Sequence, residues 1–248
     1  MRNIKLTIEY DGTNYHGWQI QKNAVTVQEK VEKAFEKLLG TRVGIVGCSR
    51  TDVGVHAFGQ VAHFHTDSGI PADKFAYAVN NLLPEDIVVR KSEEAAGDFH
   101  ARYSSKGKKY RYLICNAPHH SALLRNRACH VRPELDFEAM KKAAGYFVGQ
   151  HDFAAFQATG GQVRSTVREI YQMSLLKKEE NEGSLIELEV SGSGFLYNMV
   201  RIIAGTLIYV GMGKLQEAEI PDIIKSLDRT RAGKTAPAQG LYLVEIYY

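Results

Sequence analysis

Two kinds of hydrophobic spacing alternate along this chain, and their order is the strongest constraint on its fold. From residue 4 to residue 10, apolar and polar side chains alternate, which is the period of a half-buried strand. From residue 27 to residue 38, apolar side chains recur at helical spacing after a capping box formed by Thr26 and Glu29. Similar patterns predict strands at 42–47, 60–66 and 87–91, and a helix from Pro71 to about Leu82.

The second half of the chain repeats this order. Its patterns predict strands at 108–115, 167–176, 185–190 and 241–247, and helices after Asp136, at about 197–210 and at about 220–227. Each half therefore reads strand, helix, strand, strand, helix, strand, which is the split βαβ arrangement. We predict an α+β fold class with duplicated halves, residues 1–105 and residues 106–248, whose eight strands join in one broad sheet.

The composition is ordinary for a soluble chain, with 44% apolar and 24% charged residues. The longest nearly apolar run, 199–212, contains Arg201 and is too short to cross a bilayer, and the first residues show no secretory pattern. The three cysteines have no Cys-x-x-Cys spacing, which favours free thiols in a reducing compartment. We expect a cytoplasmic protein with no membrane partner.

Positive charge is concentrated in one part of the chain, although the net charge is only +3. Residues 99–132 contain no Asp or Glu but eight Lys and Arg residues. Such a polarised distribution is expected where one surface meets phosphates. As candidate phosphate contacts we take, as a group, Lys106, Lys108, Lys109, Arg125, Arg127 and Arg132.

The densest polar chemistry lies between two predicted strands, in the ten residues from Cys48 to Ala57. They include a guanidinium on Arg50, a hydroxyl on Thr51, a carboxylate on Asp52 and an imidazole on His56. Loops held by flanking strands place reactive groups where a ligand can reach them, so this loop is the candidate site. Asp followed closely by Gly is also ordinary turn chemistry, so the pattern by itself leaves a plain turn open.

The same loop carries the first of several motifs that belong together. Arg50-Thr51-Asp52 is followed, after one variable residue, by Gly54-Val55-His56-Ala57. Later motifs, in order along nearly the whole chain, are Phe99-His100-Ala101-Arg102, Lys109-Tyr110-Arg111-Tyr112, His151-Asp152-Phe153, Phe195-Leu196 with Met199-Val200-Arg201, and Pro237-Ala238-Gln239-Gly240-Leu241. Taken together they are highly specific, and with them the chain resembles the TruA family of tRNA pseudouridine synthases.

The resemblance implies a fold, an activity and partners. It implies two α+β halves, a central mixed, mainly antiparallel sheet with helices packed on it, a cleft between the halves, and a homodimer. It also implies that uridine becomes pseudouridine at positions 38, 39 and 40 in the anticodon stem-loop of tRNA. Ser49 and Gln239 depart from the commonest family pattern, which has glycine and histidine at these places.

This isomerisation gains and loses no atoms, so it needs no cofactor and no metal. It does need a carboxylate at the sugar, which either attacks C1′ or removes the proton of C2′. The resemblance assigns that role to Asp52 and leaves both routes open. A buried aspartate calls for a nearby cation, and the resemblance implies that Arg201 pairs with it. Helix geometry alone would also allow Arg201 to extend into solvent.

Two further residues are assigned to the substrate uridine. Tyr110 matches a family tyrosine, and its ring could stack on the uracil; by its alternation with Tyr112 and Ile114 alone it could equally be a core residue. Arg50 resembles the family arginine that helps to hold the flipped nucleotide out of the stem. We expect Asp52, Arg201 and Tyr110 to meet in one cleft between the halves.

Other functions remain as alternatives. Split βαβ units with aromatic residues on the sheet also occur in RNA-binding modules without catalytic activity. A glycosidase-type hydrolase is disfavoured because the motifs contain no second carboxylate for a general acid. A metal site built from Cys115, His119, His120, Cys129 and His130 would fit none of the usual zinc spacings.

Overall fold

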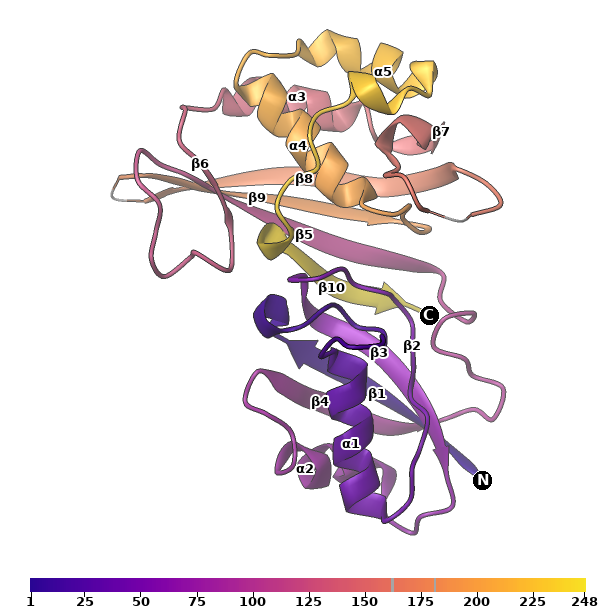
Figure 1. Ribbon diagram of the computed structural model, residues 1–248. Helices are drawn as coiled ribbons and strands as arrows, with labels where there is room; N and C mark the ends of the chain where they lie inside the picture. The colour runs from indigo at the N-terminus through magenta and orange to yellow at the C-terminus, as the bar shows by residue number, and fades with distance from the viewer. Residues whose placement is uncertain (162, 181) are drawn as a thin grey trace. The chain divides into compact units, whose positions relative to one another are not determined.

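The computed structural model describes residues 1–161, 163–180 and 182–248, and the chain forms two compact units (Figure 1). Unit 1 consists of Met1–Lys106 and Tyr242–Tyr248, and unit 2 consists of Gly107–Leu241. The break after residue 106 lies one residue from the boundary that the sequence suggested. The last strand differs from that expectation, because it belongs with unit 1 rather than with the second half.

Unit 1 contains a sheet and two helices. Its elements are β1 (Arg2–Tyr10), α1 (Val27–Leu39), β2 (Val46–Gly47), β3 (His56–Thr66), α2 (Phe75–Asn80), β4 (Ile87–Ala95) and β10 (Leu241–Tyr247). β1 lies between β4 and β3 and is antiparallel to both, and β2 is antiparallel to β3. The order β4-β1-β3-β2 is that of a split βαβ unit, because β1 and β2 run in the same direction with β3 between them.

The last strand, β10, joins unit 1 through a parallel pairing with the start of β3. Tyr242 lies opposite His56, and Leu243 lies opposite Ala57. This pairing is the physical reason why the end of the chain groups with the beginning. A pairing partner so distant in sequence leaves no mark in the local pattern of β10, so periodicity could not predict it.

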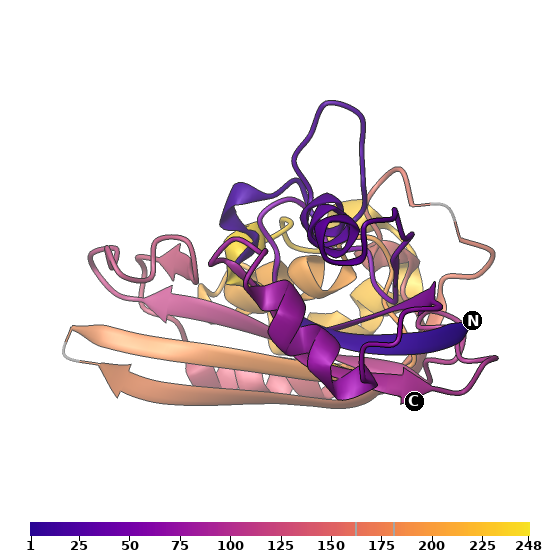
Figure 2. The same cartoon turned by 90° about the horizontal axis from the view of Figure 1, so that it is seen from below.

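The helices of unit 1 cover one face of its sheet, as Figures 1 and 2 show. At the start of α1 the Thr26 hydroxyl accepts a hydrogen bond from the Glu29 amide, and Gly40 ends the helix in the left-handed conformation. Phe35 of α1 and Phe75 of α2 both contact the ring of Phe64 on β3, at centroid distances of 4.6 and 5.5 Å. These three rings, all fully buried, form the centre of the unit 1 core.

The described residues of unit 2 form five strands and three helices. Its elements are β5 (Gly107–Asn116), β6 (Cys129–Val131), α3 (Phe137–Gly145), β7 (Gly149–Asp152), β8 (Val167–Glu180), β9 (Gly183–Gly192), α4 (Met199–Gly211) and α5 (Ile220–Ser226). β9 is antiparallel to both β5 and β8, β7 is antiparallel to β8, and β6 is parallel to β5. Figure 1 shows α3, α4 and α5 on the same face of these strands.

The predicted fold class is confirmed: the fold is α+β, with mixed, mainly antiparallel strands and helices packed on them. Several predicted bounds were wrong. Only Val46–Gly47 of the strand expected at 42–47 forms, and α2 is shorter than expected because Ala72–Lys74 is a 3₁₀ turn. β6 and β7 were missed; they have three and four residues, too few to show an alternating pattern.

The apolar helix α4 lies in the core of unit 2, and a backbone segment packs closely against it. The amide of Gly233 donates to the Thr206 hydroxyl at 2.9 Å. At Gly205 a Cβ atom would overlap the carbonyl oxygen of Lys234, so only glycine allows this approach. Of the helices in residues 1–161, 163–180 and 182–248, none is long and apolar enough to cross a membrane.

Two helical glycines of unit 2 give a matched test of this packing. Gly205→Ala should lower the free energy of unfolding by at least about 2 kcal/mol, because backbone rather than a flexible side chain must move. Gly145→Ala, at the end of α3, meets no atom within 4 Å and should leave stability unchanged or raise it by up to about 1 kcal/mol. Urea unfolding of both variants measures the difference; equal stabilities would contradict the close contact.

Candidate active site

The loop that carries Asp52 runs from Cys48 to Val55, and its first part is fixed to β3. The side chain of Gln60 is fully buried and bonds both backbone groups of Ser49: its Oε1 accepts from the Ser49 amide at 3.2 Å, and its Nε2 donates to the Ser49 carbonyl at 2.6 Å. The amide of Cys48 donates to the Val61 carbonyl at 2.8 Å. The Gln60 side chain thus satisfies the backbone amide and carbonyl of Ser49, as a neighbouring strand would, at the point where the loop leaves the sheet.

The middle of the loop is held from the other side, by β1 and the connection that follows it. The hydroxyls of Tyr10 and Thr51 are hydrogen-bonded at 2.7 Å. The Trp18 amide donates to the Thr51 carbonyl at 3.2 Å, and the Gly54 amide donates to the Tyr15 carbonyl at 3.3 Å. The residue immediately before Asp52 is therefore fixed through both its side chain and its backbone.

Two glycines allow the connection after β1 to lie close to the loop that carries Asp52. A Cβ atom at Gly12 would overlap the carbonyl oxygen of Val55, and one at Gly17 would overlap that of Thr51. Gly17 also has a positive φ of 82°. Within the loop, the Val55 amide bonds the Asp52 carbonyl at 3.2 Å and closes a turn whose Gly54 has a φ of 77°. The turn that the sequence pattern left open is therefore present, and Asp52 is its first residue.

The polar side chains of the loop differ in exposure. Asp52 is half-buried and Arg50 is exposed. Ser49 is buried and is not among the described residues with positive φ, so this position does not require the glycine common in the family. His56 is buried; its Nδ1 accepts from the Gly12 amide at 3.0 Å and lies 3.1 Å from Asp11 Oδ1, and its ring stacks on Tyr242. His56 thus anchors the end of the loop.

In unit 2, Tyr110 lies on β5 and is buried, with its ring edge against Phe195 at 5.2 Å. Its neighbour on the same face, Tyr112, is fully buried and donates its hydroxyl to the Pro237 carbonyl at 2.8 Å. Burial raises the pKa of Tyr112 far above its usual value. Tyr112 is therefore a packing residue.

Arg201 lies in the first turn of α4 and is partly buried. Its Nε donates to the Ala236 carbonyl at 2.8 Å, and its Nη1 donates to Asn198 Oδ1 at 2.7 Å. The Ala236 amide in turn bonds the Arg201 carbonyl at 3.0 Å. Asn198 has a left-handed φ of 60°, which asparagine tolerates better than most residues. The guanidinium is thus held in one orientation by protein groups.

Sequence reasoning did not select Asn198, Ala236 or Gln60, although each fixes part of the site. For Asn198 a signal was present, because a polar residue three positions before Arg201 faces the same side of a helix start. For Gln60 and Ala236 there was none, because their partners are distant in sequence.

Asp52 and Arg50 belong to unit 1, and Tyr110 and Arg201 belong to unit 2. Their meeting in one cleft stays a prediction.

The candidate phosphate contacts are not equivalent. Arg125, Arg127 and Arg132 are exposed, as is Lys106, and Lys108 is half-buried. Lys109 lies 2.7 Å from Glu189, which also bonds Arg111. Burial alone would raise the pKa of Glu189, but the hydrogen bonds from Lys109 and Arg111 outweigh it, and that pKa is lowered. Because this ion pair already neutralises its ammonium group, Lys109 is poorly suited to bind a phosphate.

Cys48, Cys115 and Cys129 are buried free thiols. Over the described part of the chain, no three or more His, Cys, Asp or Glu side chains are grouped so that they could hold a metal ion.

Comparison with known proteins gives the family. The model of the family described as tRNA pseudouridine synthase matches residues 6–104 and 143–248. The chain belongs to the tRNA pseudouridine synthase family. It is 75% identical to tRNA pseudouridine synthase A of Ruminiclostridium cellulolyticum and 59% identical to that of Acetivibrio thermocellus, in both cases over 100% of either chain.

Tyr110 and all six candidate phosphate contacts lie outside the two stretches that the tRNA pseudouridine synthase model matches, whereas Asp52 and Arg201 lie within them. The members of this family are isomerases, and the resemblance seen in the sequence motifs is confirmed over the whole chain.

Gln60 offers a test of how the loop is held. Gln60→Leu keeps the size of the side chain but leaves two buried backbone groups of Ser49 without partners, so the free energy of unfolding should fall by about 2–4 kcal/mol. Gln150→Leu, at an exposed position on β7, is the control and should change it by less than about 0.5 kcal/mol. Chemical unfolding measures both. A Gln60→Leu protein as stable as the control would contradict the role of Gln60.

Proposed function

We propose that this chain converts uridine to pseudouridine at positions 38, 39 and 40 in the anticodon stem-loop of tRNA. The observation that carries the proposal is the rigidly held loop that presents Asp52, in a chain 75% identical to a tRNA pseudouridine synthase A. The sites of modification come from the resemblance of its motifs.

In the proposed reaction Asp52 is the catalytic carboxylate. The bond between C1′ and N1 of the uridine breaks, either by attack of Asp52 on C1′ or after Asp52 removes the C2′ proton. The uracil then rotates and its C5 bonds to C1′. The proton on C5 is lost to solvent and N1 takes up a proton, so the product is an isomer of the substrate. Asp52 regains its free, ionised form, because its bond to C1′ breaks again on the first route and it returns the proton to C2′ on the second.

The role proposed for Arg201 is to stabilise the negative charge of the Asp52 carboxylate. A carboxylate in surroundings of low polarity tends to take up a proton unless a cation is near. The Arg201 guanidinium suits that role because Asn198 and Ala236 already fix its orientation, so little ordering entropy is lost when an anion binds it. We propose that it pairs with Asp52 and keeps the carboxylate ionised.

The substrate uridine must leave its stem before it can react, which costs a few kcal/mol of stacking and pairing. We propose that Tyr110 stacks on the extruded uracil and that Arg50 occupies or stabilises the vacated place. Arg50 is suited to this because it is exposed and only two residues from Asp52. The basic residues assigned above bind the tRNA phosphates, the working form is a homodimer, and the protein acts in the cytoplasm.

Tritium release tests the catalytic role of Asp52. With tRNA labelled at C5 of uridine, the wild-type protein should release tritium, and Asp52→Ala should reduce the single-turnover rate by at least about 10³-fold. Asp98→Ala, at an exposed aspartate of the same unit, is the control and should keep full activity. A fully active Asp52→Ala protein would exclude Asp52. Tight tRNA binding by a wild-type protein that releases no tritium would favour the RNA-binding module.

The salt dependence of tRNA affinity tests the basic contacts. The double variant Arg125→Ala and Arg127→Ala should make the slope of log affinity against log salt less steep by roughly 0.7–0.9 for each phosphate that the variant no longer binds. The charge-matched control is Lys141→Ala with Lys142→Ala, at exposed positions on α3, and it should keep the wild-type slope. Equal slopes for the two double variants would refute these phosphate contacts.

A further inference from the structure

The connection that follows β4 is rigid and carries an unusually exposed aromatic ring. At its centre Ala101 is fully buried: its amide donates to Nδ1 of His63 at 3.2 Å, and its carbonyl accepts from the Tyr248 hydroxyl at 2.7 Å. His100 and Ser104 are joined by two hydrogen bonds, of 3.0 and 2.9 Å. The side chain of Tyr103, between these fixed points, is nevertheless 78% exposed.

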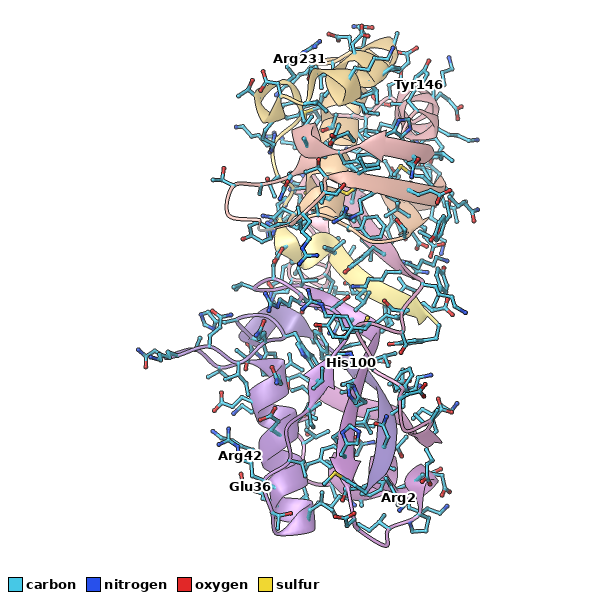
Figure 3. All side chains as sticks on the ribbon, turned by 90° about the vertical axis from the view of Figure 1, so that its right-hand side faces the viewer. Arg2, Glu36, Arg42, His100, Tyr146 and Arg231 are labelled. Atoms are coloured by element: carbon cyan, nitrogen blue, oxygen red, sulfur yellow. The ribbon has the colours of Figure 1, made fainter. Side chains whose placement is uncertain are left out.

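The imidazole of His100, which Figure 3 labels, supports this ring. Its Nδ1 accepts hydrogen bonds from the amides of Arg102 and Tyr103, at 3.2 and 3.3 Å. Its ring lies over the Tyr103 ring at a centroid distance of 4.3 Å and a tilt of 30°. The ring of His100 also contacts that of the buried His63, at a centroid distance of 4.8 Å. The exposed tyrosine is therefore the outer member of a row of rings held by backbone amides.

The charge beside this ring is positive. The Arg102 guanidinium lies 5.9 Å from the centroid of the Tyr103 ring, and Arg102 is exposed. In the described residues, no carboxylate lies within 4 Å of that guanidinium. From residue 99 to residue 132 the chain has no Asp or Glu, although Asp98 immediately precedes this stretch. An anionic partner is thus favoured at this place.

We propose that His100, Arg102 and Tyr103 form a second RNA contact, at which an unpaired base of the tRNA stacks on Tyr103 and an adjacent phosphate binds Arg102. This rests on the proposed tRNA substrate and adds a contact outside the Asp52 loop. Every base has a flat face that can stack on an aromatic ring, and arginine binds phosphates well. Because the backbone here is already fixed, little order has to be gained on binding.

Another exposed tyrosine of unit 1 provides a matched control. Tyr77 on α2 is 72% exposed, with Lys74 over its ring at 5.2 Å. There, however, the ammonium of Lys74 pairs with Asp73 at 3.0 Å, so the cation is already neutralised. Exposure and a nearby cation are therefore common to Tyr77 and Tyr103. What distinguishes Tyr103 is the supporting imidazole and a guanidinium that no described carboxylate neutralises.

The test compares tRNA dissociation constants at one fixed salt concentration. Tyr103→Ala should weaken binding by about 5- to 100-fold, the range expected for loss of one stacked base. Tyr103→Phe keeps the ring and should bind within about 2-fold of wild type, as should Tyr77→Ala. Arg102→Gln should make the salt dependence less steep by roughly 0.7–0.9. Thermal unfolding of Tyr103→Ala should match wild type, because the side chain is exposed.

Catalysis separates this inference from the proposed function. Tyr103→Ala should raise KM in the tritium assay while kcat stays near wild type, because Tyr103 binds RNA away from the reacting uridine. Wild-type affinity in Tyr103→Ala, or an equal loss in Tyr77→Ala, would overturn the contact even if tritium release were normal. If the wild type released no tritium but Tyr103→Ala still weakened tRNA binding, the proposed function would fail and the contact would stand.

Discussion

The hydrogen bonds around the loop from Cys48 to Val55 are the constraint on which the candidate site depends. An irregular backbone this close to the core must find partners for its amides and carbonyls, since unsatisfied groups cost about 1–3 kcal/mol each. Gln60 supplies two of these partners, and the connection after β1 supplies others through Trp18 and Tyr15. The result is a loop whose shape is set by the scaffold, with Asp52 at the start of its turn.

In unit 2, backbone contacts likewise hold the surroundings of a candidate site residue, Arg201. The extended segment from Ala232 to Pro237 lies against α4, which is possible because residue 205 is glycine. The Ala236 carbonyl of that segment accepts a hydrogen bond from Arg201, and Asn198 Oδ1, at the start of the helix, accepts a second one. In both units, therefore, the backbone beside a proposed catalytic residue is held by contacts that a glycine permits.

Local features of the fold could be predicted from the sequence, and distant ones could not. The helix α1 was found because its cap at Thr26, its stripe around Phe35 and its end at Gly40 are all local signals. The grouping of β10 with unit 1 depends on a pairing with His56 almost two hundred residues earlier, which no local pattern encodes. In the site, Asp52 and Arg201 came from motifs. The residues that hold them, such as Gln60 and Ala236, act through tertiary contacts and were missed.

Amide hydrogen exchange tests directly whether the loop from Cys48 to Val55 is held in place before RNA binds. The amides to follow are those of Ser49 and Gly54, which donate to Gln60 and to Tyr15. In the free protein their exchange should be slowed by about 10³-fold or more, and an anticodon stem-loop RNA should change it by less than about 10-fold. Nearly unprotected amides in the free protein, with protection gained only when the RNA binds, would contradict the account.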